Sequence, residues 1–250
     1  MAIREDAQRN HDHLFPNHQS TLKRTDPELV EIFDNWAFGD VLTDRTLDAR
    51  TRLIVQLAAL VACQAIREFG VMVGGALDVG VSPVEIKEVV YQTVPYVGMG
   101  KAFDFLHVTN EVFTGRGIEL PLPGQSTTNQ ETRFDKGVAV QKEIFGDTID
   151  EMRASAPKDQ LHVQDFLAAN CFGDYYTRTG LTLEIRELVT FAILAALGGC
   201  EPQLAGHVAG NVALGNDRRM LVGTLTHLLP FIGYPRTLNA LRLVDEGTRQ

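Results

Sequence analysis

Cysteine is scarce in this chain of 250 residues, which contains only Cys63, Cys171 and Cys200. So small and odd a number excludes the disulfide framework that holds many small secreted domains together. Runs of lysine or arginine are also missing, and the formal net charge is -9. Nucleic-acid binders usually present a basic stripe to the phosphates, so we expect no nucleic-acid partner.

Long apolar runs are missing as well. The longest, residues 191–199, is about half of what a bilayer span requires. Residues 1–17 are polar and contain no apolar signal-peptide core. Hydrophobic residues make up 44% of the chain and charged residues 22%, which is ordinary for a soluble globular protein. We therefore expect a cytoplasmic protein with no membrane partner.

The chain does contain an internal repeat. Residues 38–52 read FGDVLTDRTLDARTR and residues 172–186 read FGDYYTRTGLTLEIR, with Phe, Gly, Asp, Thr, Leu and Arg recurring 134 positions apart. PYVG at residues 95–98 returns as PFIG at residues 230–233, 135 positions later. Unrelated helices that share Ala and Leu by chance would not keep Gly and Pro in register. We interpret the pattern as a duplicated module.

Each copy has the pattern of a set of helices. In the second copy Thr182 suits an N-cap, apolar residues recur at helical spacing up to Ala195, and the Gly198–Gly199 pair ends the helix. Strand-like runs of β-branched residues with period two are absent. The sequence therefore predicts an all-α fold made of a duplicated helical module. Further helices are expected at about residues 202–214, 217–229 and 234–246, and in the first copy at about 48–65, 68–78, 83–93 and 101–113.

The segment between the copies, GIELPLPGQSTTNQET at residues 117–132, is rich in Pro, Gly and polar residues and reads as a linker. It separates an N-terminal module (residues 1–116) from a C-terminal module (residues 133–250). We expect two lead-in helices in residues 133–170, with a shorter counterpart in residues 26–36.

The polar N-terminal tail contains His11, His13 and His18, which read as solvated side chains. No metal-ligand spacing is present, and no Gly-rich phosphate loop follows a strand. We expect neither a metal nor a cofactor.

His207 follows Cys200 by seven positions, so both side chains share one face of a helix that begins near Cys200. The start of a helix favours a thiolate, and His207 is placed to exchange a proton with it. The alternative is a small apolar cysteine beside a satisfied histidine. Glu187, on the preceding helix, stands among apolar neighbours and needs a partner. His207 is the favoured partner for this carboxylate, and a nearby arginine or solvent is the alternative partner.

The first copy serves as an internal control for these residues. Leu53 stands opposite Glu187, and Met72 stands opposite His207. Opposite Arg178 stands Asp44. A polar cluster needed only for folding should recur in both copies, because both have the same core to build. The asymmetry predicts that Glu187, His207 and Arg178 are functional.

Tyr175, Tyr176 and Arg178 lie just before the helix that carries Glu187. The planar fork of Arg178 suits a substrate carboxylate, because it offers two parallel hydrogen bonds. A rim salt bridge with aromatic packing is the alternative reading. Tyr234 and Arg236, at the entry of the last helix, are lesser candidates for substrate binding.

The second copy, GLTLEIRELVTFAILAALGGCEPQLAGHVAGNVALGN followed by PFIGYPRTLNAL, resembles the carboxymuconolactone decarboxylase family, including its AhpD-like alkylhydroperoxidase branch. The resemblance covers about residues 38–113 and 172–246. It implies an all-α module that assembles into rings, with pockets near module contacts. A fused pair of modules should then form a homo-oligomer, most simply a trimer.

The resemblance leaves three functions open. The first is a carboxymuconolactone decarboxylase-like lyase acting on a small carboxylated molecule, with a His207/Glu187 proton-transfer pair and Arg178 as carboxylate anchor. The second is a thiol-dependent peroxidase acting on a hydroperoxide through Cys200. The peroxidase branch uses a Cys-x-x-Cys pair, whose second position is Gln203 here, so Cys171 or a small thiol would have to resolve the reaction. The third is a non-catalytic binding or assembly protein.

Overall fold

The computed structural model describes residues 2–16 and 18–249, and this part of the chain contains helices and no strand. The prediction of an all-α fold is confirmed. The first half forms α1 (Glu5–Leu14), α2 (Leu22–Thr25), α3 (Pro27–Asp34), η1 (Asn35–Asp40), η2 (Val41–Thr43), α4 (Ala49–Ala62), α5 (Ile66–Asp78), α6 (Pro83–Val97) and α7 (Met99–Gly115). The second half forms α8 (Arg133–Phe145), α9 (Thr148–Ser155), η3 (Lys158–Gln160), α10 (Leu161–Phe166), η4 (Leu167–Tyr176), α11 (Leu183–Leu197), α12 (Glu201–Ala213) and α13 (Arg218–Gly247).

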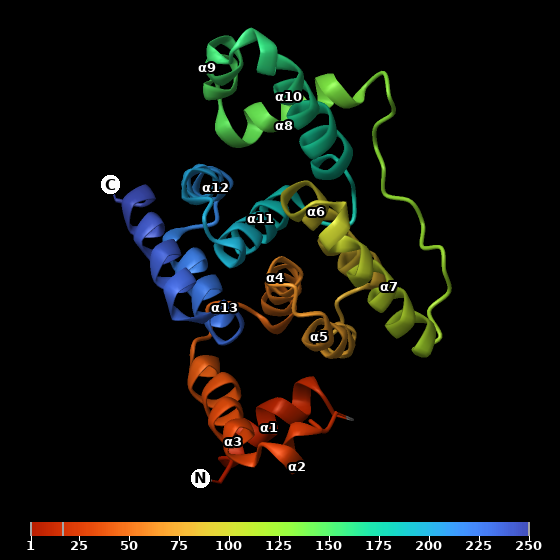
Figure 1. The fold of residues 1–250 in the computed structure, drawn as a ribbon, viewed down its shortest axis with the longest axis vertical. Helices are drawn as coiled ribbons and strands as arrows, with labels where there is room; N and C mark the ends of the chain where they lie inside the picture. The colour runs from red at the N-terminus through yellow and green to blue at the C-terminus, as the bar shows by residue number, and fades with distance from the viewer. Residues whose placement is uncertain (1, 17, 250) are drawn as a thin grey trace.

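The central layer of the molecule is built around α4 and α11, which pack against each other with α6 and α13 beside them (Figure 1). Both central helices are buried on nearly all sides, as expected for helices whose sequences are apolar all round. One continuous apolar core therefore spans both modules.

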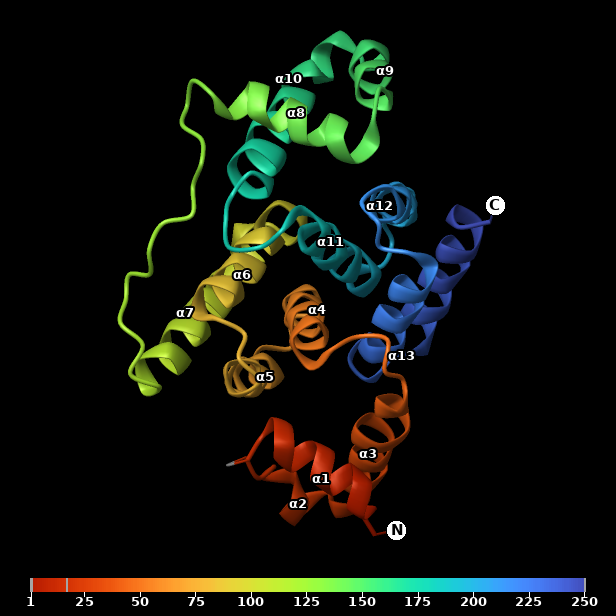
Figure 2. The same cartoon turned by 180° about the vertical axis from the view of Figure 1, so that it is seen from behind.

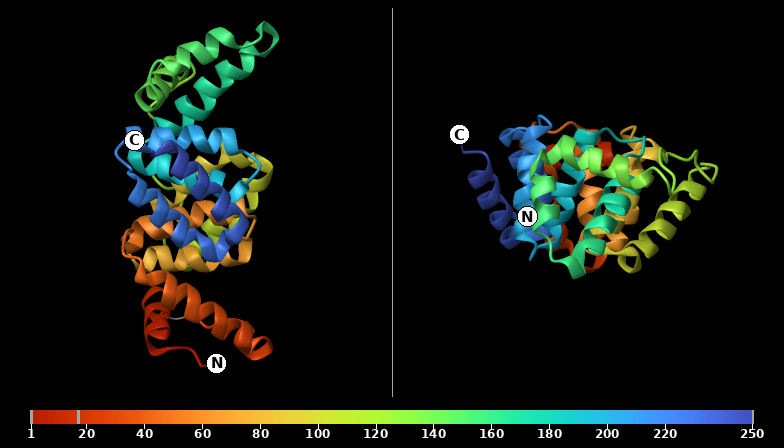
Figure 3. Two further views of the ribbon diagram at one scale, coloured as in Figure 1. Left: turned by 90° about the vertical axis from the view of Figure 1, so that its left-hand side faces the viewer. Right: turned by 90° about the horizontal axis from the view of Figure 1, so that it is seen from above.

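A helical arm lies at each end of the central layer. Figure 3 shows an elongated molecule with α8–α10 at one end and α1–α3 at the other. The linker, residues 117–132, runs as an extended segment along the outer edge from α7 to α8 (Figure 2). No helix in residues 2–16 and 18–249 combines the length and apolar character needed to cross a bilayer.

The two copies use the same local signals. The side chain of Asp48 accepts a hydrogen bond from the backbone N–H of Thr51 at 2.9 Å, and Thr182 caps α11 in the same way. Gly98 and Gly233 occupy matched positions with φ of 82° and 77°, a conformation that glycine adopts without strain. The first separates α6 from α7, and the second breaks α13 at the point where a new helix was predicted.

The N-terminal segment corrects one expectation. The sequence predicts a polar tail in which His11, His13 and His18 are solvated, but α1 forms there and His11 is buried. Its ring contacts Phe38 edge-on, at 5.2 Å between centroids. Ala7, His11 and Leu14 recur at a spacing of three to four residues and form one buried stripe in an otherwise polar helix. The sequence pattern conceals the stripe, because its central residue is a histidine.

Residues 133–170 correct a second expectation, because they contain more than the two predicted helices. Gly146, with φ of 67°, ends α8, and Pro157 precedes the short helix η3. The helices α8 and η4 cross with their backbones in contact: a Cβ added to Gly137 would collide with the carbonyl oxygen of Ala168. This close crossing holds α8 in place beside α12.

His227, on α13, makes folding sensitive to acid. The side chain is fully buried, 3.6 Å from Asp44, and burial, with the nearby Arg52, lowers its pKa to about 4. The folded state therefore binds a proton less readily than the unfolded state, where the histidine pKa is about 6.5. The stability linked to a neutral His227 is complete above about pH 6.5 and is lost as the pH falls toward 4.

We expect His227→Gln to remove this acid sensitivity. Between about pH 7.5 and about pH 4.5 the unfolding free energy of the unaltered chain should fall by roughly 2–3 kcal/mol more than that of the variant. Urea denaturation at both pH values measures the difference. Equal losses in the two proteins would show that His227 does not titrate in this range.

Candidate functional site

The site is organised around a fully buried carboxylate, Glu187 on α11. A buried carboxylate needs partners that replace water. The Nδ1 of His207 lies 2.8 Å from Oε2 of Glu187, and the hydroxyl of Tyr176 donates to Oε1 at 2.7 Å. Because Nδ1 is held by the carboxylate, Nε2 is the ring nitrogen available to a ligand.

Further contacts fix the backbone and the ring of His207. On the same helix, α12, the side-chain amide of Asn211 donates to the carbonyl oxygens of Glu187 at 3.0 Å and of His207 at 2.7 Å. The imidazole packs edge-on against the rings of Phe145 and Tyr96. The ring plane is therefore fixed by contacts from α8, α6 and α11.

A buried set of hydroxyls continues the network away from Glu187. The hydroxyl of Tyr176 lies 2.6 Å from that of Thr190 and 3.1 Å from that of Tyr96. Burial raises the pKa of both tyrosines well above its usual value, so both hydroxyls stay protonated. Tyr96 belongs to α6, so the first module contributes a residue to the site of the second.

A cavity of about 560 Å³ opens in front of His207. It lies between α8, α9, η4, α11, α12 and the end of α6. Its polar lining includes Tyr96, Gln141, Gln203 and His207, together with the thiols of Cys171 and Cys200. Its apolar wall includes Phe145, Ile149, Met152, Leu167, Leu194 and Leu197. The cavity is large enough for a small organic molecule.

Two thiols line the cavity, and burial favours the protonated form of each. Cys200 is the N-cap residue of α12, as predicted, and its thiol lies 3.4 Å from the carbonyl oxygen of Leu194. Burial raises the pKa of Cys200, which works against the thiolate that its place at the helix start favours. Burial raises the pKa of Cys171 to about 12. Both thiols are free of disulfide bonds.

At the matched site of the first module, four positions that correspond to the polar network are apolar. Met72, opposite His207, and Leu53, opposite Glu187, are buried. Leu42 takes the place of Tyr176, and Phe231 takes the place of Tyr96. The remaining cavity beside Met72 and Phe231 is only about 20 Å³. A cavity of about 280 Å³ does open in the first module, beside Phe38 and Val71, the counterparts of Phe172 and Gly206, but neither Met72 nor Leu53 lines it. A polar network that faces a cavity therefore occurs in the second module alone among the described residues.

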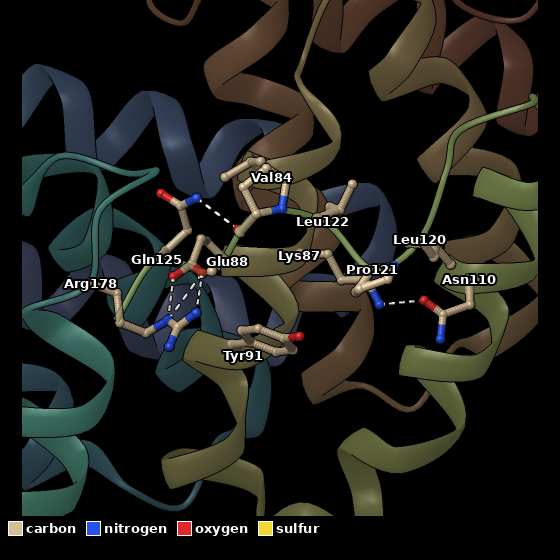
Figure 4. A pocket seen from close by; sticks show the side chains of 12 residues that line it. Val84, Lys87, Glu88, Tyr91, Asn110, Leu120, Pro121, Leu122, Gln125 and Arg178 are labelled. Atoms are coloured by element: carbon tan, nitrogen blue, oxygen red, sulfur yellow. Dashed lines mark hydrogen bonds and ion pairs between the residues drawn. The ribbon is translucent and has the colours of Figure 1, made fainter. Parts of the chain in front are cut away.

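Arg178 lies outside the cavity that His207 faces. Its guanidinium bonds both carboxylate oxygens of Glu88 at 2.9–3.0 Å, and the same carboxylate accepts from Arg186 at 2.9 Å. Figure 4 shows Arg178 and Glu88 beside Lys87 and Tyr91, in a separate cavity of about 400 Å³ that the linker covers. The structure therefore does not bring Arg178 to His207. Its fork is already occupied by a carboxylate of the first module.

The other predicted substrate-binding residues are scattered. Tyr176 is in the network, whereas the half-buried Tyr175 lies near Arg178. Tyr234 is 59% exposed and stacks on Trp36, and Arg236 contacts the thiol of Cys63. None of these three lines the His207 cavity among the described residues.

Several residues of the site are not predicted from the sequence, among them Asn211, Phe145, Tyr96 and Gln141. Tyr96 had a usable signal, because the matched residue in PFIG is Phe231, another polar-to-apolar difference between the copies. Gln141 lies on α8 outside the repeat blocks, so no comparison between the copies could identify it. No group of three or more His, Cys, Asp or Glu in residues 2–16 and 18–249 is arranged to hold a metal ion.

One family model matches both halves of the chain. The model of the "Carboxymuconolactone decarboxylase family" matches residues 27–111 and again residues 162–246. The 4-carboxymuconolactone decarboxylase of Acinetobacter baylyi is 27% identical over 119 residues, 47% of this chain and 88% of that protein. The nitrosuccinic acid decarboxylase of Metarhizium robertsii is 30% identical over 81 residues, 32% of this chain and 57% of that protein.

A solved structure from Burkholderia xenovorans, described as a gamma-carboxymuconolactone decarboxylase subunit, aligns over 96% of this chain and 97% of that chain. Its TM-score is 0.55 and its sequence identity is 21%. At that identity the likeness supports the fold.

Proposed function

Because the chain belongs to the carboxymuconolactone decarboxylase family, we propose that it is a decarboxylase-like carbon–carbon lyase in which His207 donates a proton to carbon. One observation carries the proposal: a buried Glu187–His207 pair faces an open cavity in the second module, whereas the matched pair of the first module, Leu53 and Met72, is apolar and buried. The named decarboxylases among the relatives support the reaction class.

The proposed reaction needs one proton donor and a shielded cavity. The C–C bond to the substrate carboxylate breaks, carbon dioxide leaves, and the electron pair passes into an adjacent carbonyl group of the substrate. The imidazolium of His207 then donates its proton to the substrate carbon and regains one from water. Glu187 is a positioning residue that holds Nδ1 and stabilises the imidazolium. The apolar wall keeps water from the carboxylate.

The proposal assigns no anchoring role to Arg178, because Glu88 already occupies its guanidinium. A small carboxylated molecule remains the proposed substrate class. A homo-oligomer, most simply a trimer, and a cytoplasmic location both stay predictions. The exposed apolar side chains of Leu29, Ile32 and Phe103 are candidates for burial in such an assembly.

The reaction class is tested by supplying both kinds of substrate to the purified chain. Carbon dioxide release is measured from 4-carboxymuconolactone and from a panel of small 3-oxo acids and lactone carboxylic acids. Peroxide consumption is measured with an organic hydroperoxide and a thiol reductant. We expect carbon dioxide release from at least one acid of the set and no peroxide turnover. Thiol-dependent peroxide consumption without carbon dioxide release would replace the lyase by the peroxidase.

Cys200→Ser separates the two chemistries at the level of a single atom. In the lyase the thiol is only a neighbour, so we expect turnover to stay within about threefold of the unaltered chain, whereas a peroxidase would lose its nucleophile. Cys171→Ser is the matched control, because it removes the second thiol of the same cavity. A loss of lyase turnover confined to Cys200→Ser would give the thiol a role that the proposal denies.

A further inference from the structure

The cavity in front of His207 has an unusual charge balance for a site that receives carboxylates. Among the described residues that line it, none is Lys, Arg, Asp or Glu. Cys171, Cys200 and Tyr96 are neutral at physiological pH, because burial raises the pKa of each. His207 is the one lining side chain that can carry a positive charge, and Glu187 stands directly behind it.

This charge balance limits the number of carboxylates that the cavity accepts. One carboxylate can pair with the His207 imidazolium. A second would lose its hydration against side chains such as Leu194, Leu197 and Met152, with no cation to compensate. The cost of that uncompensated charge appears directly in the dissociation constant.

The cavity also contains one neutral polar group without a partner. The side chain of Gln141, on α8, is buried, and its Oε1 accepts no hydrogen bond from the described residues. A buried amide without a partner is costly, and a ligand hydroxyl that donates to it removes the cost. Gln141 therefore marks the place of a neutral polar group on the ligand, away from the carboxylate.

We infer that the His207 cavity selects a mainly apolar monocarboxylate that carries a neutral hydroxyl for Gln141, and that it discriminates against dicarboxylates. The inference rests on the proposed function only in taking this cavity as the substrate site. It names the substrate class from the lining and from no relative.

Binding of stable probes tests the inference without turnover. Isothermal titration calorimetry on the full chain compares cyclohexanecarboxylate with cyclohexane-1,4-dicarboxylate, which has the same ring and one more carboxylate. We expect the monocarboxylate to bind at least about tenfold more tightly. Gln203→Arg places a cation in the cavity wall one turn before His207. It should reduce the ratio of the two dissociation constants about tenfold.

Gln141 is tested with a probe that differs by one hydroxyl. Gln141→Leu should weaken binding of 4-hydroxycyclohexanecarboxylate by about fivefold or more and leave cyclohexanecarboxylate unchanged. Gln164→Leu is the matched control, because its Oε1 is equally buried and unpartnered but lies outside the cavity. Equal losses for both probes would remove the specific role of Gln141.

Two outcomes overturn the preference for monocarboxylates: equal or tighter binding of the dicarboxylate, and no binding of either acid at about 10 mM. Failure of the lyase proposal looks different, because it leaves the binding preference intact while no carbon dioxide is released. Carbon dioxide release from a tightly bound dicarboxylate would keep the lyase and reject this inference.

Discussion

His207→Ala is expected to lower kcat of the proposed lyase by about 100-fold or more, because proton transfer to carbon loses its donor. KM should change much less, since the apolar wall that holds the substrate is untouched. The measurement is steady-state carbon dioxide release on whichever acid proves active. Thermal unfolding of the same sample shows whether the variant is folded.

His162→Ala is the matched control, because His162 is exposed on α10 and lines no part of the cavity. Added imidazole should restore part of the activity of His207→Ala, since a small base can enter the space that the ring leaves. Full activity in His207→Ala would reject both enzymatic readings. The Glu187–His207 pair would then be a packing feature of the second module.

Glu88→Gln is expected to destabilise the fold by about 3–5 kcal/mol, because it leaves two guanidinium groups without their shared carboxylate. Glu88 is almost fully buried and accepts hydrogen bonds from Arg178 and Arg186. Arg186 is itself fully buried, and desolvation lowers its pKa, so it depends on this partner. The pair joins α6 of the first module to α11 of the second.

The measurement is the unfolding free energy from urea denaturation at neutral pH. Glu85→Gln is the control on the same helix, because Glu85 pairs with the half-exposed Arg50 and a glutamine can still accept the capping hydrogen bond from Ser82. Its cost should be less than about 1 kcal/mol. Comparable small effects for both variants would show that the buried cluster contributes little to stability. Gln92 connects this cluster to Thr190 in the hydroxyl network.

The helices and the duplication are encoded locally, and the sequence by itself determined them. Capping residues such as Asp48 and Thr182, the breaks at Gly98 and Gly233, and apolar residues at helical spacing depend only on neighbours a few positions away. The difference between His207 and Met72 is also legible, because two copies of one module can be compared position by position. That comparison predicted the pair that the structure brings together.

The partners of the remaining polar side chains were decided by tertiary structure. Arg178 meets Glu88, and Tyr96 reaches the network of Tyr176, only because α6 of one module packs against η4 and α11 of the other. The pKa of Cys200 follows its burial, which no local pattern reports. Local sequence sets which residues share a helix face; the packing of helices distant in the chain sets what that face meets.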